Sequence, residues 1–193
     1  MKKSLARKLS VFFAGIVFIT CLVLVGLTVM IFGNIEDRMK DVLYENTLQS
    51  YKTEVKSEVQ SAISSIEYYY NLSDSGKIDE ATAKKDALEA LRNLRYGDDD
   101  SGYFWVDDTD YNLVMHPILP EQEGTNRYDL TDKNGVKIIQ SIMKTAESGG
   151  GFNEFYFTKS DGKTVAPKVA YSQKFDKWNW VITTGIYSDD IHE

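Results

Sequence analysis

The sequence predicts an α+β fold in which a transmembrane helix and a long helix precede a five-stranded antiparallel sheet. Residues 11–32 form an uncharged apolar run, and residues 34–75 contain neither Gly nor Pro. Beyond Gly102 the pattern changes to short runs of aromatic and β-branched residues between turn residues, which is typical of strands. With 193 residues, the chain has room for about one domain besides its appendages.

The apolar run is long enough to cross a membrane, because a spanning helix needs about 20 apolar residues. The segment before it carries four cations and no acidic residue, namely Lys2, Lys3, Arg7 and Lys8. The positive-inside rule then keeps residues 1–10 in the cytoplasm and residues 34–193 outside, anchored in the inner (cytoplasmic) membrane. A cleaved signal peptide is the alternative, but its apolar core is only about 7 to 15 residues and ends at an A-x-A-like site, which is missing here.

Charge and cysteine content exclude several classes of protein. The chain carries 22 Lys and Arg against 29 Asp and Glu, a net charge of −7, which argues against nucleic acid as a partner. Cys21 is the only cysteine and falls within the apolar run. The exported part therefore has no disulfide, thiolate nucleophile or cysteine metal site.

Two helices are expected after the membrane segment. Apolar residues recur at steps of three and four over residues 35–71, and at about 1.5 Å per residue such a helix is longer than one small domain needs. We expect its membrane-proximal half to pack on a second copy of the chain. A second helix is predicted at 79–95, with Asp79 or Thr82 as its N-cap.

The core at 101–187 is expected to combine a hairpin, a crossing helix and three further strands. The hairpin covers 103–106 and 111–116, and the helix falls between Asp132 and Ser148. The last strands lie near 152–158, 164–171 and 178–186, with a turn at 160–162 between the first two. A long helix followed by such a sheet is a PAS-like arrangement.

Several side chains of this core suggest an anion-binding cavity. Strand alternation places Tyr103 and Trp105 on one side of their strand, and Lys168 between two alanines on one side of another. Arg95 falls on the apolar stripe of the second helix, and His116 ends a strand before a proline. Together they predict a small aromatic-walled cavity whose cations bind a carboxylate.

Each of these residues also has a structural interpretation. Arg95 can complement the helix dipole or extend to water. Lys168 can be a solvated strand residue, and His116 a satisfied structural histidine. The aromatic residues can be plain core side chains.

No catalytic or metal site is predicted. The sequence contains no G-x-S-x-G, H-E-x-x-H or phosphate-binding Gly-rich loop, which argues against an enzyme. The acidic groups at 98–100 and 107–110 lack the ligand spacing of a calcium loop. A hydrolase that uses His116 as its base remains a remote alternative. No cofactor is expected.

The sequence resembles the single Cache (sCache, Cache type 2) sensor domains of bacterial methyl-accepting chemotaxis proteins and sensor histidine kinases. The similarity covers about residues 35–190 and is carried by fragments in register: Leu94-Arg95-Tyr96-Gly97, Gly102-Tyr103-Phe104-Trp105-Val106-Asp107, Met115-His116-Pro117, Gly150-Gly151-Phe152 with Tyr156, Pro167-Lys168-Val169-Ala170-Tyr171 and Trp178 to Tyr187.

The resemblance implies a PAS-like sensor outside the cytoplasm that binds small molecules, often short carboxylates, with Arg95, Tyr103, Trp105, His116 and Lys168 at pocket positions. Tyr156, in one of the matching fragments, completes the candidate ligand contacts. Phe157 departs from the family pattern, which more often has Trp there. The chain also stops at Glu193, where family members usually continue into a second membrane helix and an output module.

The leading hypothesis is a chemoreceptor-type sensor that binds a short-chain carboxylate and signals through the long helix as a homodimer. An amino-acid ligand would require Asp107 or Glu154 to turn inward for the ammonium group. The sequence is also compatible with the sensor region of a histidine kinase, or with a module that binds a periplasmic solute-binding protein.

Overall fold

The computed structural model describes residues 2–97, 100–159, 161 and 163–192. The acidic residues at 98–99 and two of the three residues of the turn expected at 160–162 lie outside this range. The chain divides into two units, Met1–Asn46 and Thr47–Glu193. The second unit contains the sheet and the candidate site.

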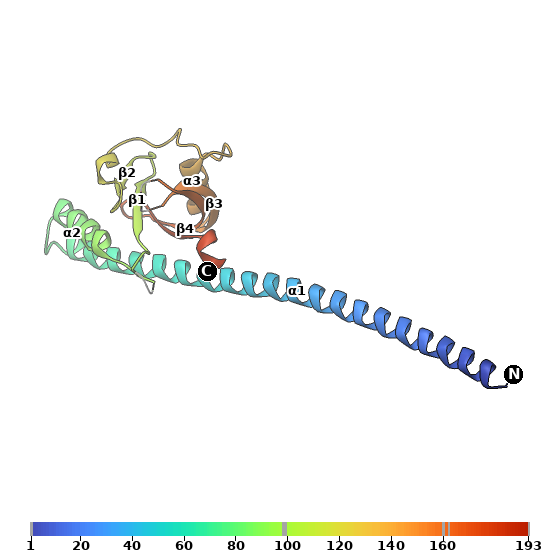
Figure 1. Cartoon of the computed structure of the whole chain (residues 1–193). Helices are drawn as coiled ribbons and strands as arrows, with labels where there is room; N and C mark the ends of the chain where they lie inside the picture. Colours follow the sequence, from blue (N-terminus) through green and yellow to red (C-terminus); the bar gives the residue numbers. More distant parts are fainter. Residues whose placement is uncertain (1, 98–99, 160, 162, 193) are drawn as a thin grey trace. The chain divides into compact units, whose positions relative to one another are not determined.

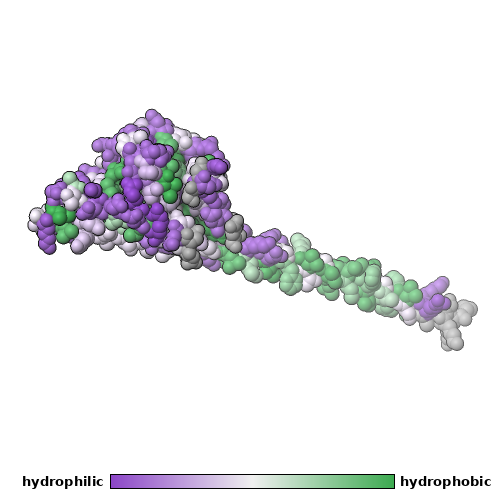
Figure 2. Space-filling view, turned by 60° about the vertical axis from the view of Figure 1, so that its left-hand side comes forward, coloured by the Kyte–Doolittle hydropathy of each residue, from purple (hydrophilic) through white to green (hydrophobic). Residues whose placement is uncertain are grey.

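Helix α1 runs from Lys2 to Asp74, so the two predicted segments at 11–32 and 35–71 belong to one helix. In the first unit, the side chains from Val11 to Phe32 are all exposed, and they form the continuous hydrophobic surface of Figure 2. Within the described ranges, α1 is the one helix long and apolar enough to cross a membrane. Helix α1 ends just before Gly76, which adopts a positive φ of 72°. The Lys77 N–H donates a hydrogen bond to the Leu72 carbonyl oxygen, as in many helix C-caps.

In the second unit, α1 and α2 (Glu80–Asn93) cover one face of the sheet, as Figure 1 shows. The α1 residues Val55, Val59, Ala62 and Ile66 are fully or almost fully buried, at the steps of four and three that mark one helix face. Asp79 is the N-cap of α2 and accepts hydrogen bonds from the N–H and hydroxyl of Thr82. The helix ends at Asn93 because Leu94 is already extended, two residues before the predicted end.

The sheet has the order β2-β1-β5-β4-β3, and all neighbouring strands are antiparallel, which confirms the predicted architecture. The strands are β1 (Phe104–Asp108), β2 (Leu113–Met115), β3 (Gly151–Thr158), β4 (Val165–Phe175) and β5 (Trp180–Tyr187). Short 3₁₀ helices η1 (Pro120–Gln122) and η2 (Ser188–His192) follow β2 and β5.

Helix α3 (Ile138–Glu147) packs on the other face of the sheet (Figure 1). It begins later than Asp132, because that carboxylate accepts the N–H groups of Asn134 and Val136 and holds the segment in a turn. Five α3 side chains are buried against the sheet. This second core, between α3 and the sheet, contains Tyr103 and Trp105 and houses the candidate site.

Candidate functional site

The centre of the site is Lys168, in the middle of β4. Only 1% of its surface is exposed. Its ammonium nitrogen donates a hydrogen bond of 2.9 Å to the Tyr103 hydroxyl and lies 4.4, 5.0 and 4.6 Å from the ring centres of Tyr103, Trp105 and Tyr187. Among the residues that the structure describes, no carboxylate forms a salt bridge with it.

Among the described residues, a phenol oxygen and three rings are the partners of this buried ammonium group, and such an environment compensates its charge poorly. Burial of an ion costs several kcal/mol unless a counter-charge or hydrogen bonds offset it. Cation–π contacts contribute about 2 kcal/mol or more each when they are desolvated, but they supply no negative charge. An anionic ligand would complete the environment of Lys168.

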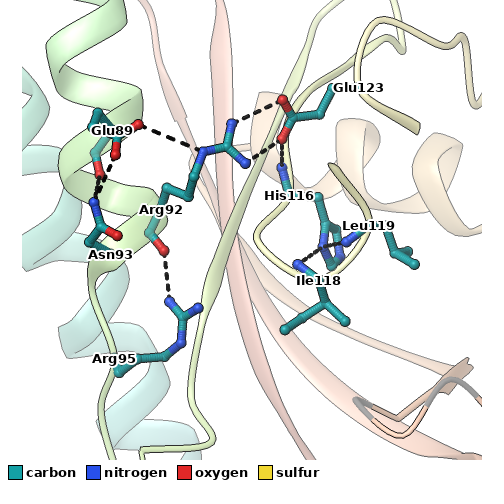
Figure 3. A network of polar contacts seen from close by, with 8 residues as sticks. All are labelled: Glu89, Arg92, Asn93, Arg95, His116, Ile118, Leu119 and Glu123. Carbon is teal, nitrogen blue, oxygen red and sulfur yellow. Dashed lines mark hydrogen bonds and ion pairs between the residues drawn. The ribbon is translucent and has the colours of Figure 1, made fainter. Parts of the chain in front are cut away.

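His116 lies beside this group, directly after β2. Its ring is 6.1 Å from the Trp105 ring, centre to centre, with an interplanar angle of 24°, and 5.3 Å from the Tyr103 ring. Its Nδ1 accepts the backbone N–H groups of Ile118 and Leu119 at 3.1 and 3.2 Å (Figure 3). The ring hydrogen therefore resides on Nε2, which makes this atom a hydrogen-bond donor.

His116 is neutral at physiological pH. Burial, together with the charges of Arg127, Lys168 and Arg92, lowers the pKa of His116 to about 3. The backbone N–H of His116 donates to the Glu123 carboxylate at 2.8 Å. Glu123 in turn forms a bidentate ion pair with Arg92, with N–O distances of 2.7 and 2.9 Å (Figure 3). The pair thus ties helix α2 to the loop that carries the histidine.

The structure adds a residue that the sequence did not reveal, Arg127. It lies in the loop between η1 and α3 and is 6% exposed. Its Nε and Nη2 both donate to Oδ1 of Asp107 in β1, which is fully buried. Burial raises the pKa of Asp107, whereas the charge and hydrogen bonds of Arg127 oppose this rise. No periodicity distinguishes an arginine in an irregular loop, and its partner is 20 residues away.

A cavity lies next to this arginine. It is lined by three polar or aromatic side chains of the site and by four apolar ones, namely Trp105, His116, Arg127, Ile138, Ile139, Phe155 and Phe157. Its volume is only about 10 Å³, close to the minimum for a single water molecule. A carboxylate could enter only after the surrounding side chains had moved apart.

A second, larger depression of about 580 Å³ lies near the C-terminal end of β5. Tyr51 and Glu54 of α1, Tyr96, Tyr103 and Tyr187 are among the residues that line it. Tyr103 and Tyr187 also contact the ammonium group of Lys168, so these two rings border both the depression and the buried lysine.

The structure gathers four of the six candidate residues and places two elsewhere. Tyr103, Trp105, His116 and Lys168 form one cluster. Arg95 is exposed, and its Nη1 donates to the carbonyl oxygen of Arg92 at 2.8 Å (Figure 3). The same nitrogen also donates to the carbonyl oxygen of Leu94 at 2.8 Å. This contact completes the end of α2, as expected of a cation at a helix C-terminus.

Tyr156 also lies outside the cluster. Successive residues of a strand point to opposite faces, so its neighbours Phe155 and Phe157 line the cavity instead. The ammonium nitrogen of Lys133 lies over the Tyr156 ring, 3.7 Å from the ring centre, in a cation–π contact. Its backbone N–H donates to Asp132 at 2.9 Å, which joins β3 to the turn before α3.

The family model described as Single Cache domain 2 matches residues 47–193. This chain belongs to that family. The matched range coincides with the second unit of the structure, so the Cache domain comprises the sheet, its helices and the C-terminal part of α1.

Similar proteins are sensors. The chain is 34% identical to the sensor histidine kinase MctS of Rhizobium johnstonii over 82% of its own length and 33% of that protein. It is 27% identical to the methyl-accepting chemotaxis protein McpP of Pseudomonas putida over 77% of its own length and 27% of that protein. The chain therefore corresponds to a third or less of the length of these curated relatives.

A solved Cache domain shares the fold. It is a chemosensory domain whose structure concerns carboxylic acid recognition. The two are 26% identical, with a TM-score of 0.69 over 74% of this chain and 97% of that one. The predicted family and fold are thus confirmed.

Proposed function

We propose that this chain is the extracytoplasmic ligand-sensing region of a transmembrane signal transducer of the chemoreceptor type, and that it binds a small organic anion such as a short-chain carboxylate. The observation that carries the proposal is the buried ammonium group of Lys168, for which the described residues provide no carboxylate. The carboxylic acid recognition described for a similar Cache domain supports it.

The contacts of the cluster favour a short ligand. A carboxylate between Lys168 and His116 would receive a charge-assisted bond from the ammonium group and one from Nε2–H. The apolar walls formed by Ile138, Ile139 and Phe155 would then cover a hydrocarbon tail. Because the cavity is small, a tail of one to a few carbons is the expected size.

The N-terminal unit would anchor this sensor in the cytoplasmic membrane. The exposed apolar residues from Val11 to Phe32 match the length of a membrane span, and Arg7 and Lys8 on the N-terminal flank favour a cytoplasmic N-terminus. The Cache domain would then lie in the periplasm or outside the cell.

Signalling would proceed through α1 in a homodimer. Ile35, Met39 and Val42 are about half exposed in the first unit, at steps of four and three that form an apolar stripe on which a second copy could pack. Ligand binding would favour one of two packings of the paired helices. The sensor region of a histidine kinase is the alternative suggested by the kinase among the similar proteins.

The test is a calorimetric titration of the full 193-residue chain in lipid nanodiscs against acetate, propionate, lactate, pyruvate, short dicarboxylates and amino acids. Lys168→Met should abolish a saturable signal from its carboxylate ligand. Lys144→Met, the same change at an exposed position of α3, should leave it unchanged. No saturable signal in the wild type, or equal binding by Lys168→Met, would contradict the proposal.

A further inference from the structure

The buried ion pair between Asp107 and Arg127 adjoins the proposed ligand site. The side chains of Arg127 and Asp107 are 5% and 0% exposed. Arg127 lines the cavity together with Trp105 and His116, and Trp105 also borders the ammonium group of Lys168. The indole ring of Trp105 is thus common to the surroundings of the pair and of the lysine.

The charges of this cluster can be counted. Lys168 and Arg127 are cations, and His116 is neutral because of its burial. Arginine keeps its proton in proteins, so an ionised Asp107 is the group that compensates Arg127 in the interior. One positive charge, that of Lys168, remains for a ligand.

The ion pair also engages Asp107, one of the two carboxylates that could serve as counter-charge for the ammonium group of an amino-acid ligand. Asp107 does point into the core. Its Oδ1 accepts two bonds from Arg127, while its buried Oδ2 has no hydrogen-bond partner among the described residues, so Arg127 takes up the charge of this carboxylate but not all of its acceptor atoms. Glu154, the other carboxylate considered for this role, is exposed and lies near Lys52 of α1 at 3.7 Å. An ammonium group in the cavity would therefore lack a free counter-charge among the described residues.

We propose that the Asp107–Arg127 pair sets the charge of the ligand that the site accepts, so that it admits a monoanion and rejects dianions and zwitterions. This inference rests on the proposed function and specifies its ligand class. Asp107 acts as a specificity determinant by neutralising Arg127. Without that neutralisation the site would hold two uncompensated cations near Trp105, which suits a dicarboxylate.

The experiment compares the wild-type chain with Asp107→Asn in nanodiscs, by titration with propionate and with succinate. Asparagine keeps the shape and the acceptor oxygen but removes the charge. We expect the ratio of the dissociation constants to shift towards succinate by about tenfold or more, since a charge-assisted bond is gained. In Asp107→Asn combined with Arg127→Gln, one net positive charge remains, and the ratio should return to the wild-type value.

Arg127→Gln alone provides a second test. Unlike Asp107→Asn, this change does not leave a buried arginine without its counter-charge. Asp107 then loses its counter-charge, so propionate binding should require Asp107 to take up about one proton. Calorimetry in buffers of different ionisation enthalpy measures this uptake, and we expect none in the wild type. An unchanged ligand ratio in Asp107→Asn, or binding without proton uptake in Arg127→Gln, would overturn the inference. Absence of wild-type binding by every compound of the panel, acetate, propionate, lactate and pyruvate included, would instead contradict the proposed function.

Discussion

The side-chain nitrogen of Lys168 on β4 lies 2.9 Å from the hydroxyl oxygen of Tyr103, which stands 65 residues earlier, just before β1. The two strands are not neighbours, because β5 lies between them. Tyr103 belongs to the core between the sheet and α3, and the bond brings the Lys168 ammonium group to the same side. This bond joins the two halves of the sheet through the proposed ligand site.

Replacement of Tyr103 by Phe should destabilise the Cache domain. The phenol oxygen is the hydrogen-bond acceptor for a buried ammonium group, and loss of such a partner costs about 1 to 3 kcal/mol. Thermal unfolding of the chain in nanodiscs, followed by circular dichroism, measures the change. Tyr128→Phe, at a side chain that is 46% exposed, is the matched control, and an equal effect of the two changes would argue against this role.

Lys168→Met should have the opposite effect on stability in the absence of ligand. Methionine fills a similar volume without the cost of a buried charge, so the free energy of unfolding should be unchanged or should rise by about 1 kcal/mol or more. Chemical denaturation measures it. A loss of several kcal/mol would mean that the ammonium group is already well compensated without a ligand.

The burial of His116 predicts a pH dependence of stability. Its pKa is about 3 in the folded protein and about 6.5 when unfolded, so the unfolded chain binds an extra proton between these values. Stability should therefore fall as the pH drops from about 6.5 towards 3, by about 2 kcal/mol between pH 7 and pH 5. His116→Asn, which can still accept the N–H groups of the following turn, should remove this part of the slope. Parallel curves for both proteins from pH 7 to pH 5 would contradict the prediction.

Gly185→Ala should distort the centre of the sheet. A Cβ atom at this position of β5 would overlap the Val169 carbonyl oxygen and would lie 2.9 Å from the Ala170 side chain. Relief of this overlap requires a backbone shift, with an expected cost of about 1 to 3 kcal/mol. A melting temperature equal to that of the wild type would contradict the prediction, because it would mean that β4 and β5 move apart at this position at little cost.

Local pattern accounts for most of the fold that the sequence predicted. The uncharged run at 11–32, the helical spacing of Val55, Val59 and Ala62, and the strand patterns on either side of α3 depend on residues close in sequence. Helical and strand periods follow from backbone geometry alone. For the same reason, the sequence correctly placed Tyr103 and Trp105 on one face and Lys168 between two alanines on another strand.

Contacts between distant segments were decided only by the tertiary structure. The strand order and the pairing of Asp107 with Arg127 depend on how loops cross the sheet, which no local period encodes. Arg95 and Tyr156 matched the expected motif positions, but an early helix end and strand alternation turned them away from the cluster. The sequence by itself determined the elements and the faces of their side chains, because these are local properties; the assembly of the charges around Lys168 required the packed fold, because burial and distance set their energy.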